Sequence, residues 1–233
     1  ASPVGRTRTL PVGSPQRLRL AVLSCAQFGK GYFNAYRRVA ERADLDLVLH
    51  LGDYLYEYGT GEYGSVREYE PAHEIVTLAD YRTRHAQYRR DPDLQALHQQ
   101  HALIPIWDDH ETADDAYEDG AGNHQPDAEG TWSARKQAAK QAYFEWMPIR
   151  DPGMQRIYRT LRYGNLADIV LLDTRLEGRD QQLDSTSELP GEAASRSLLG
   201  AEQEAWLDAE LAASSARWVI LAQQVMVAQL SFS

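Results

Sequence analysis

Three strand-like apolar runs of this chain end in residues that could bind a cation. The first run ends at Ser24-Cys25, the second at Gly52-Asp53-Tyr54-Leu55-Tyr56, and the third at Trp107-Asp108-Asp109-His110-Glu111. A thiolate, carboxylates and a phenolate gathered at one point would repel one another unless a cation held them. Carboxylates suit hard cations, whereas a thiolate with a phenolate suits a transition metal such as iron. A two-metal centre about 3.5 to 4 Å across, bridged by one carboxylate, would account for the surplus of ligands.

Each of these residues also has a simpler structural explanation. Cys25 alone is typical of a small buried apolar residue. The Gly52-Asp53-Tyr54 stretch is compatible with a plain turn, and residues 108–111 with a solvated acidic start of a helix. The tyrosines of the second run are compatible with half-buried aromatic packing. The expected surface or packing histidines are His50, His85, His98 and His101. Joint occurrence at consecutive strand ends favours the metal site over these separate explanations.

The expected secondary structure places the three run ends at one edge of a sheet. Strands are predicted at 17–24, 45–51, 102–107, 167–173 and 217–224, and their apolar character on both faces predicts central strands covered on both sides. Residues 157–164 are predicted to form a hairpin with the strand that follows. Helices are predicted at 32–43, 78–90, 132–146 and 201–213, with another that Asp91 caps and Pro92 begins. Alternating strands and helices indicate an α/β fold, in which ligands bind beyond the carboxyl ends of the strands.

The composition excludes several classes of function. The chain has 233 residues, 43% of them hydrophobic, with a net charge of −10, and the charge argues against a nucleic-acid groove. An anionic substrate would need a local positive centre. No apolar run approaches the roughly 18 residues of a membrane span, and no targeting signal is visible at the N-terminus.

The single cysteine cannot form an intrachain disulfide. Segments 59–74 and 113–131 are predicted to be long surface loops.

Eight stretches carry a family resemblance, and they occur in the order LSCAQF, GYFNAYRRVA, LDLVLHLGDYLYEYG, IPIWDDHETADDAY, GNHQP, AYFEWMPIR, LLDTRL and LAQQVMVAQL. In order and spacing they resemble the PhoD-type alkaline phosphatases and phosphodiesterases of the calcineurin-like metallophosphoesterase superfamily. The resemblance covers the chain from about Leu18 to Leu230. It implies a metallophosphoesterase-type β-sandwich flanked by helices (αββα), partial in this chain. It also implies an iron (Fe³⁺) and calcium centre that hydrolyses small-molecule phosphate esters in the periplasm or as a secreted enzyme.

The resemblance assigns roles to individual residues. It implies that Cys25 and Tyr56 bind iron and that Asp53 bridges the two metals. Asp109 takes the place of the superfamily's metal-binding asparagine, and His110 matches a histidine that contacts the phosphate. Asp114, at a position where relatives often have asparagine, is expected to supply another ligand. A metal-bound hydroxide would then attack phosphorus in line.

Two arginines are candidates for contacting the phosphate. Arg135 lies on the predicted amphipathic helix WSARKQAAKQAYFEWM and could reach the phosphate with its planar fork, although a solvated helix face is the alternative. Arg175 follows a strand end and is the weaker candidate of the same kind. Asp173 beside it either orients a site residue or caps a turn.

The resemblance also predicts how the chain is divided. Residues 1–15 are expected to be the last strand of a small β-domain, and 16–233 the N-terminal part of the catalytic domain. Family members carry a later Gly-Asp-x-His type segment that completes the metal site, and none of the seven histidines follows His124. We therefore expect a C-terminal remainder of the same protein to supply the missing ligands. The alternative is a catalytically inactive binding or scaffold fragment that retains the fold.

Overall fold

The structure is a computed structural model that describes residues 4–150, 153, 156–183 and 195–227. Its strands are β1 (Leu20–Leu23), β2 (Leu47–His50), β3 (Leu103–Pro105), β4 (Arg159–Tyr163), β5 (Ala167–Leu171) and β6 (Trp218–Ala222). Its helices are the 3-10 helix η1 (Phe28–Lys30), α1 (Asn34–Ala40), α2 (Leu78–Tyr88), α3 (Pro92–Gln100), α4 (Pro126–Glu129), α5 (Trp132–Trp146) and α6 (Gly200–Ala213).

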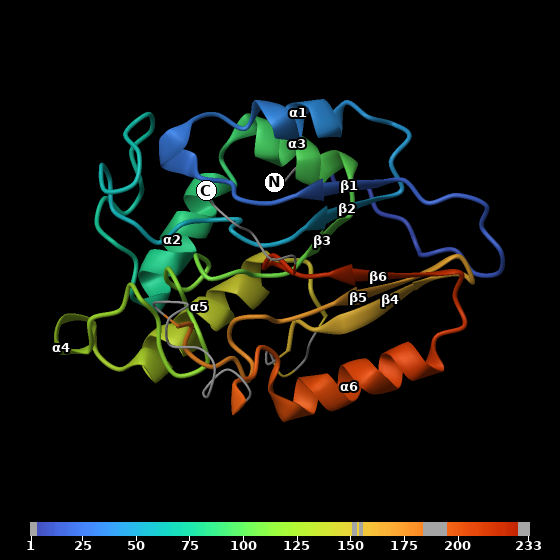
Figure 1. Cartoon of the computed structure of the whole chain (residues 1–233). Helices are drawn as coiled ribbons and strands as arrows, with labels where there is room; N and C mark the ends of the chain where they lie inside the picture. The colour runs from blue at the N-terminus through green and yellow to red at the C-terminus, as the bar shows by residue number, and fades with distance from the viewer. Residues whose placement is uncertain (1–3, 151–152, 154–155, 184–194, 228–233) are drawn as a thin grey trace, which may run out of the picture.

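The described strands form two sheets that pack as layers between helices. One sheet has the parallel order β1-β2-β3, and the other has the order β4-β5-β6, with β4 antiparallel and β6 parallel to β5. Helices α1 and α3 cover the outer face of the first sheet, and α6 covers that of the second (Figure 1). This arrangement confirms the predicted α/β fold with a β-sandwich flanked by helices, and β4 with β5 forms the predicted hairpin.

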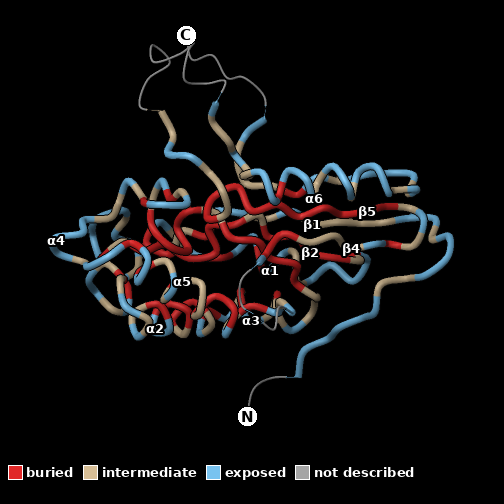
Figure 2. Tube along the Cα trace, turned by 90° about the horizontal axis from the view of Figure 1, so that it is seen from below, coloured by how far each residue is buried: buried red, intermediate tan, exposed pale blue. Residues whose placement is uncertain are grey.

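The central strands are buried and the edge strands are not. Every residue of β2 and β5 is buried, and Figure 2 shows these strands in the interior while the outer turns of α6 face solvent. On the edge strands, Val22 is 56% exposed and Trp218 is 62% exposed. The prediction that all strands are covered on both faces is therefore wrong for β1 and β6. Each lies at the edge of its sheet, and the exposed side chains are Val22 of β1 and Trp218, Val219 and Leu221 of β6.

Side-chain caps account for the starts of α2, α3 and α5. Asp91 caps α3 by accepting hydrogen bonds from two backbone N–H groups, and Pro92 begins the helix, as predicted. Thr77 and Asp80 form a reciprocal capping box at the start of α2. Helix α5 has the predicted bounds. Helix α1 is shorter than the predicted 32–43, because the chain ends it early to enter the first sheet, where the Asp46 N–H donates to the Arg19 carbonyl.

The N-terminal stretch, expected to be the last strand of a separate β-domain, is described from residue 4 onward. Residues 4–15 contain no strand, because a ladder needs a partner along its length and here the Arg6 N–H donates to the Gln99 carbonyl at 2.7 Å instead. The first three residues of that predicted strand lie outside the described part of the chain. The division into 1–15 and 16–233 stays a prediction. Among the residues that the structure describes, no helix has the length and apolar character to cross a membrane.

Candidate metal centre

The loops after β1, β2 and β3 meet at the carboxyl ends of the first sheet, as the sequence predicts. The Cys25 and Ala26 N–H groups donate to the carbonyls of Gly52 and Asp53, at 3.2 and 2.7 Å. A Cβ atom on Gly52 would lie 2.3 Å from the Asp108 nitrogen, so only glycine allows the loops after β2 and β3 to approach this closely. Cys25 and Asp53 both have positive φ angles, of 59° and 54°, and such strained residues cluster at functional sites.

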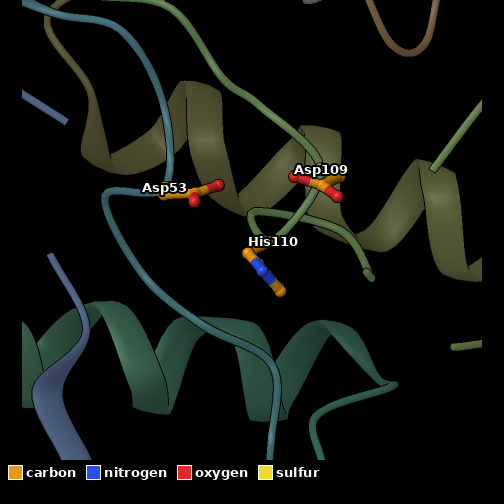
Figure 3. A group of neighbouring side chains, drawn as sticks. All are labelled: Asp53, Asp109 and His110. Atoms are coloured by element: carbon orange, nitrogen blue, oxygen red, sulfur yellow. The ribbon is translucent and has the colours of Figure 1, made fainter. Parts of the chain in front are cut away.

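Asp53, Asp109 and His110 form a group with the spacing of metal ligands. One ligand atom from each lies within 4.8 Å of the others, and the carboxylates of Asp53 and Asp109 face each other across a small space (Figure 3). The Asp53 Oδ2 atom accepts a hydrogen bond from the Tyr56 hydroxyl at 2.9 Å, whereas its Oδ1 atom is buried without a hydrogen-bond partner among the described residues. A buried carboxylate oxygen with nothing to bind is an available ligand atom.

A second group continues the site toward solvent. Asp109, Asp114 and Asp115 also offer ligand atoms within 4.8 Å of one another. Tyr58 donates to the Oδ2 atom of Asp114 at 2.8 Å, and the Asp115 N–H donates to Oδ2 of Asp109 at 2.7 Å. The predicted ligands Asp53, Asp109 and Asp114 are therefore brought together, with Asp109 belonging to both groups.

Burial and crowding raise the pKa of several of these carboxyls. Burial is the main cause for Asp53, where the charge of Asp109 adds to the rise and His110 opposes it. Burial and Asp109 raise the pKa of Asp108 to about 7, and burial raises the pKa of Glu111 well above its usual range. A cation beside Asp53 would lower the cost of keeping these crowded carboxyls charged. The site therefore fits a bound metal ion.

Cys25 and Tyr56 lie beside Asp53, as expected of additional ligands. The thiol is exposed, and it interacts with both Asp53 and Tyr56. Partial burial and the Asp53 charge raise its pKa. Burial and Asp53 also raise the pKa of Tyr56 far above its usual range, so Tyr56 keeps the proton that it donates to Asp53. Cys25 belongs to neither compact ligand group of the described residues.

Two buried glutamates that the sequence interpretation missed hold this site together. Glu111 accepts hydrogen bonds from the N–H groups of Asp53, Tyr54 and Asp108, at 3.0, 2.6 and 2.9 Å. It thereby joins the loops after β2 and β3. Glu57 accepts from the Asp114 N–H at 2.7 Å and from the Asn123 amide at 3.0 Å. In the sequence, each glutamate lies soon after a buried strand. Glu57 stands among the tyrosines after β2, and Glu111 stands in the acidic stretch after β3.

His110 is held in one orientation by Glu57. Its Nδ1 atom lies 2.8 Å from Oε2 of Glu57, and its ring packs on Tyr56 with centroids 4.2 Å apart. Burial opposes the charged form of His110, but the hydrogen bond and charge of Glu57, with Asp109 and Asp53, raise its pKa to about 10. In the absence of a cation these contacts favour the charged imidazolium, whose Nε2 atom lies 3.8 Å from Oδ1 of Asp114.

Arg135 does not reach the site, contrary to expectation. Its side chain is fully buried, and all five N–H donors are satisfied within the fold. The acceptors are the Tyr81 hydroxyl, the Asn123 and Ile75 carbonyls, and the carboxylates of Glu129 and Glu74. Packing turns this face of α5 inward, so neither the phosphate contact nor the solvated helix face is correct. Arg135 instead anchors the loop that carries Asn123, a partner of Glu57.

Arg175 is the arginine that lies at the site. Its Nε atom donates to Oδ1 of Asp108 at 2.5 Å, and its Nη2 atom lies 3.4 Å from Oδ1 of Asp109. Asp173 caps the turn that carries it, because Oδ1 of Asp173 accepts from the N–H groups of Arg175 and Leu176 at 3.0 and 2.9 Å. His50 and His85 are buried packing residues and His98 is a partly buried one, as expected.

Comparison with known proteins identifies relatives of the chain. The sequence model of the PhoD-like phosphatases matches residues 20–233. The chain belongs to the PhoD-like phosphatase family. It is similar to alkaline phosphatase D of Bacillus subtilis (strain 168), with 43% identity over 249 residues that cover 99% of this chain and 41% of that protein.

A solved structure of a family protein shares the fold. The structure described as that of PhoD superposes with a TM-score of 0.87 and 41% sequence identity, over 98% of this chain and 46% of the other. The chain thus spans less than half the length of each of these PhoD-like relatives. The superposition supports the fold of the described sheets and the meeting of their loops at one edge.

Proposed function

We propose that the protein hydrolyses small-molecule phosphate esters, monoesters or diesters, as a metal-dependent phosphatase. The observation that carries this proposal is the group formed by Asp53, Asp109 and His110, in which a buried Asp53 oxygen has no partner among the described residues. Membership of the PhoD-like phosphatase family supports the same reaction. A cation and an adjacent protonated histidine suit the charge on a phosphoryl group.

The donor set supports iron together with calcium. Cys25 and Tyr56 would bind ferric iron, since thiolate and phenolate suit a strong Lewis acid. Asp109 and Asp114 would bind calcium through carboxylate oxygens, and Asp53 would serve both ions. When bound, the ions supply Lewis-acid activation of a water molecule and of the phosphoryl oxygens.

The chain's own residues orient the ester and supply a proton donor. His110 would donate from Nε2 to a phosphoryl or leaving-group oxygen, while Glu57 keeps the ring in place from Nδ1. Tyr56 limits the movement of the His110 ring, because the two rings are in contact. Ligands from a C-terminal remainder of the protein would complete the metal site.

Metal analysis and an assay test the proposal together. The chain is compared with a version extended through the C-terminal segment that relatives carry, each loaded with Fe³⁺ and Ca²⁺. We expect the extended protein to hydrolyse p-nitrophenyl phosphate or its diester and to show a visible charge-transfer band from Tyr56 to iron. The given chain should bind metal weakly and show little activity. Full metal content without hydrolysis in the extended protein would instead support an inactive binding or scaffold module.

We also propose a location outside the cytoplasm, in the periplasm or the medium, on the strength of the family resemblance. Fractionation of the source cells, followed by detection of the protein in each fraction, tests this location. Recovery in the cytoplasmic fraction alone would contradict it.

A further inference from the structure

The guanidinium of Arg175 carries a buried donor that the fold does not use. The residue is 8% exposed, and its Nη1 atom has no hydrogen-bond partner among the described residues. The Oδ1 atom of Asp115 lies 3.9 Å from Nη1, beyond hydrogen-bond distance. A buried donor left unpaired is unfavourable, and more so when the group is charged. A ligand that accepts from Nη1 would remove this penalty.

Two aspartates fix the direction in which the guanidinium points. Asp108 accepts from Nε at 2.5 Å, and Asp109 lies 3.4 Å from Nη2. Because the guanidinium is planar, anchoring these two nitrogens also fixes the Nη1 donors. Asp109 belongs to both groups of potential metal ligands, so Nη1 is held at the edge of the metal centre.

The chemistry of Nη1 selects an anion with several acceptor oxygens as its ligand. A guanidinium nitrogen offers donors and no acceptor, so its ligand must accept hydrogen bonds. The whole chain carries a net charge of −10, so an anionic substrate needs a local positive centre beyond the metals. Arginine recognises phosphate better than lysine does, because its fork donates to two oxygens at once.

We propose that Nη1 of Arg175 binds a phosphoryl oxygen of the substrate and of the inorganic phosphate product, with Asp108 as its positioning residue. The inference rests on the proposed phosphatase function and adds the residue that contacts the phosphoryl group. A purely structural role predicts something different. If Arg175 only balanced the charge of the aspartates, lysine would replace it without affecting phosphate binding.

The test uses the protein extended through the C-terminal segment and loaded with Fe³⁺ and Ca²⁺. It measures inorganic phosphate binding by calorimetry, alongside metal content and hydrolysis. We expect Arg175→Lys to weaken phosphate binding by about tenfold or more at unchanged metal content, because the lysine point charge lacks the fork. Asp108→Asn should weaken binding by a smaller factor. The matched control is Arg162→Gln, since Arg162 also pairs with two carboxylates, Asp168 and Glu210, but on β4.

The outcomes separate the two proposals. Wild-type phosphate affinity in Arg175→Lys, with hydrolysis intact, overturns the Arg175 assignment and leaves the phosphatase function standing. A wild-type protein that contains both metals yet neither binds phosphate nor hydrolyses esters overturns the function and the Arg175 inference together. Circular dichroism of each variant shows whether the fold is retained, and Arg175→Lys keeps the charge that the aspartates need.

Discussion

Asp53 is the residue on which the candidate metal centre depends most directly. Its backbone N–H is fixed by Glu111, its Oδ2 atom accepts from Tyr56, and its Oδ1 atom has no partner among the described residues. Its positive φ of 54° costs free energy that the surrounding hydrogen bonds offset. The backbone and the hydrogen-bond network thus hold the Asp53 carboxylate in a conformation in which Oδ1 could bind a cation.

Replacing Asp53 with asparagine should remove metal binding and keep the fold. The new amide would keep the shape of the side chain but lose the charge that we propose two cations share. We therefore expect metal affinity and hydrolysis to fall by more than about 100-fold. Metal titration and urea unfolding of Asp53→Asn measure the two effects. Asp127→Asn on the exposed helix α4 is the control. Near-normal turnover in Asp53→Asn would show that Asp53 does not bridge the metals.

The charge of Glu57 should control the protonation of His110. In Glu57→Gln the hydrogen-bonded geometry can persist, but the negative charge that favours the imidazolium is lost. We expect the pKa of His110 to fall from about 10 toward the ordinary histidine value of about 6.5. Ring NMR titration of the metal-free chain measures this change. Hydrolysis should fall about 10- to 100-fold, as for other residues that orient a ligand. An unchanged His110 titration would exclude the Glu57 pairing.

Among the elements of the fold, the loops after β2 and β3 matter most, because the site depends on how closely they approach. Gly52 has a φ of 100°, and a Cβ atom there would lie 2.3 Å from the Asp108 nitrogen. Glu111 joins the same two loops through three backbone N–H groups. The parallel register of β2 with β3 brings these loops together, because both strands end at the same edge.

Gly52→Ala should therefore destabilise the protein more than the same substitution at a glycine whose added Cβ atom would contact no other atom. Gly130 also has a positive φ, of 83°, but nothing lies within 4 Å of its added Cβ atom. Gly130→Ala should cost about 1–3 kcal/mol of unfolding free energy from strain alone, because φ 83° with ψ −163° is a conformation that few residues other than glycine adopt. Gly52→Ala should cost about 1–3 kcal/mol more from overpacking and should lower metal affinity. Urea unfolding of both variants tests this difference, and equal costs would show that the loops yield easily.

Across the whole molecule, the core contains histidines that are kept neutral by burial. Burial lowers the pKa values of His50, His85 and His98 to about 3 each, with Arg89 adding to the effect on the last two. An unfolded chain protonates these residues below about pH 6.5, whereas the folded chain does not. The unfolded state therefore binds more protons between about pH 6.5 and 3, and the folded state loses stability as the pH falls through this range.

His85→Phe should make the protein more resistant to acid. His85 stacks on Trp146 at 5.9 Å with its Nδ1 atom unpartnered among the described residues, so a phenyl ring can occupy its place. Each such histidine contributes a slope of up to about 1.4 kcal/mol per pH unit below pH 6.5. Unfolding free energies at pH 7 and pH 5 should therefore differ less in His85→Phe than in wild type. His73→Gln, at a largely exposed histidine, should behave like wild type; an equal pH dependence in all three would contradict this account.

Short stretches of sequence specify the elements of this protein and the chemistry at their ends. Apolar runs predict β2, β3 and β5, Asp91 with Pro92 predicts the start of α3, and the residues that follow the strands predict a cation site near Asp53 and Asp109. These signals are local, because a run, a cap or a strand end is readable from a few neighbouring residues. The family resemblance predicted the sandwich on the same motifs.

Packing between distant elements determines which arginine lies at the site and which carboxylates orient it. Arg135 and Arg175 both follow plausible motifs, but Arg135 is enclosed by acceptors from Glu74 and Glu129, whereas Arg175 meets Asp108 and Asp109. Glu57 and Glu111 likewise acquire their roles from partners brought close by folding. A side chain's direction depends on how elements distant in sequence pack against it, and a single sequence does not contain that packing in readable form.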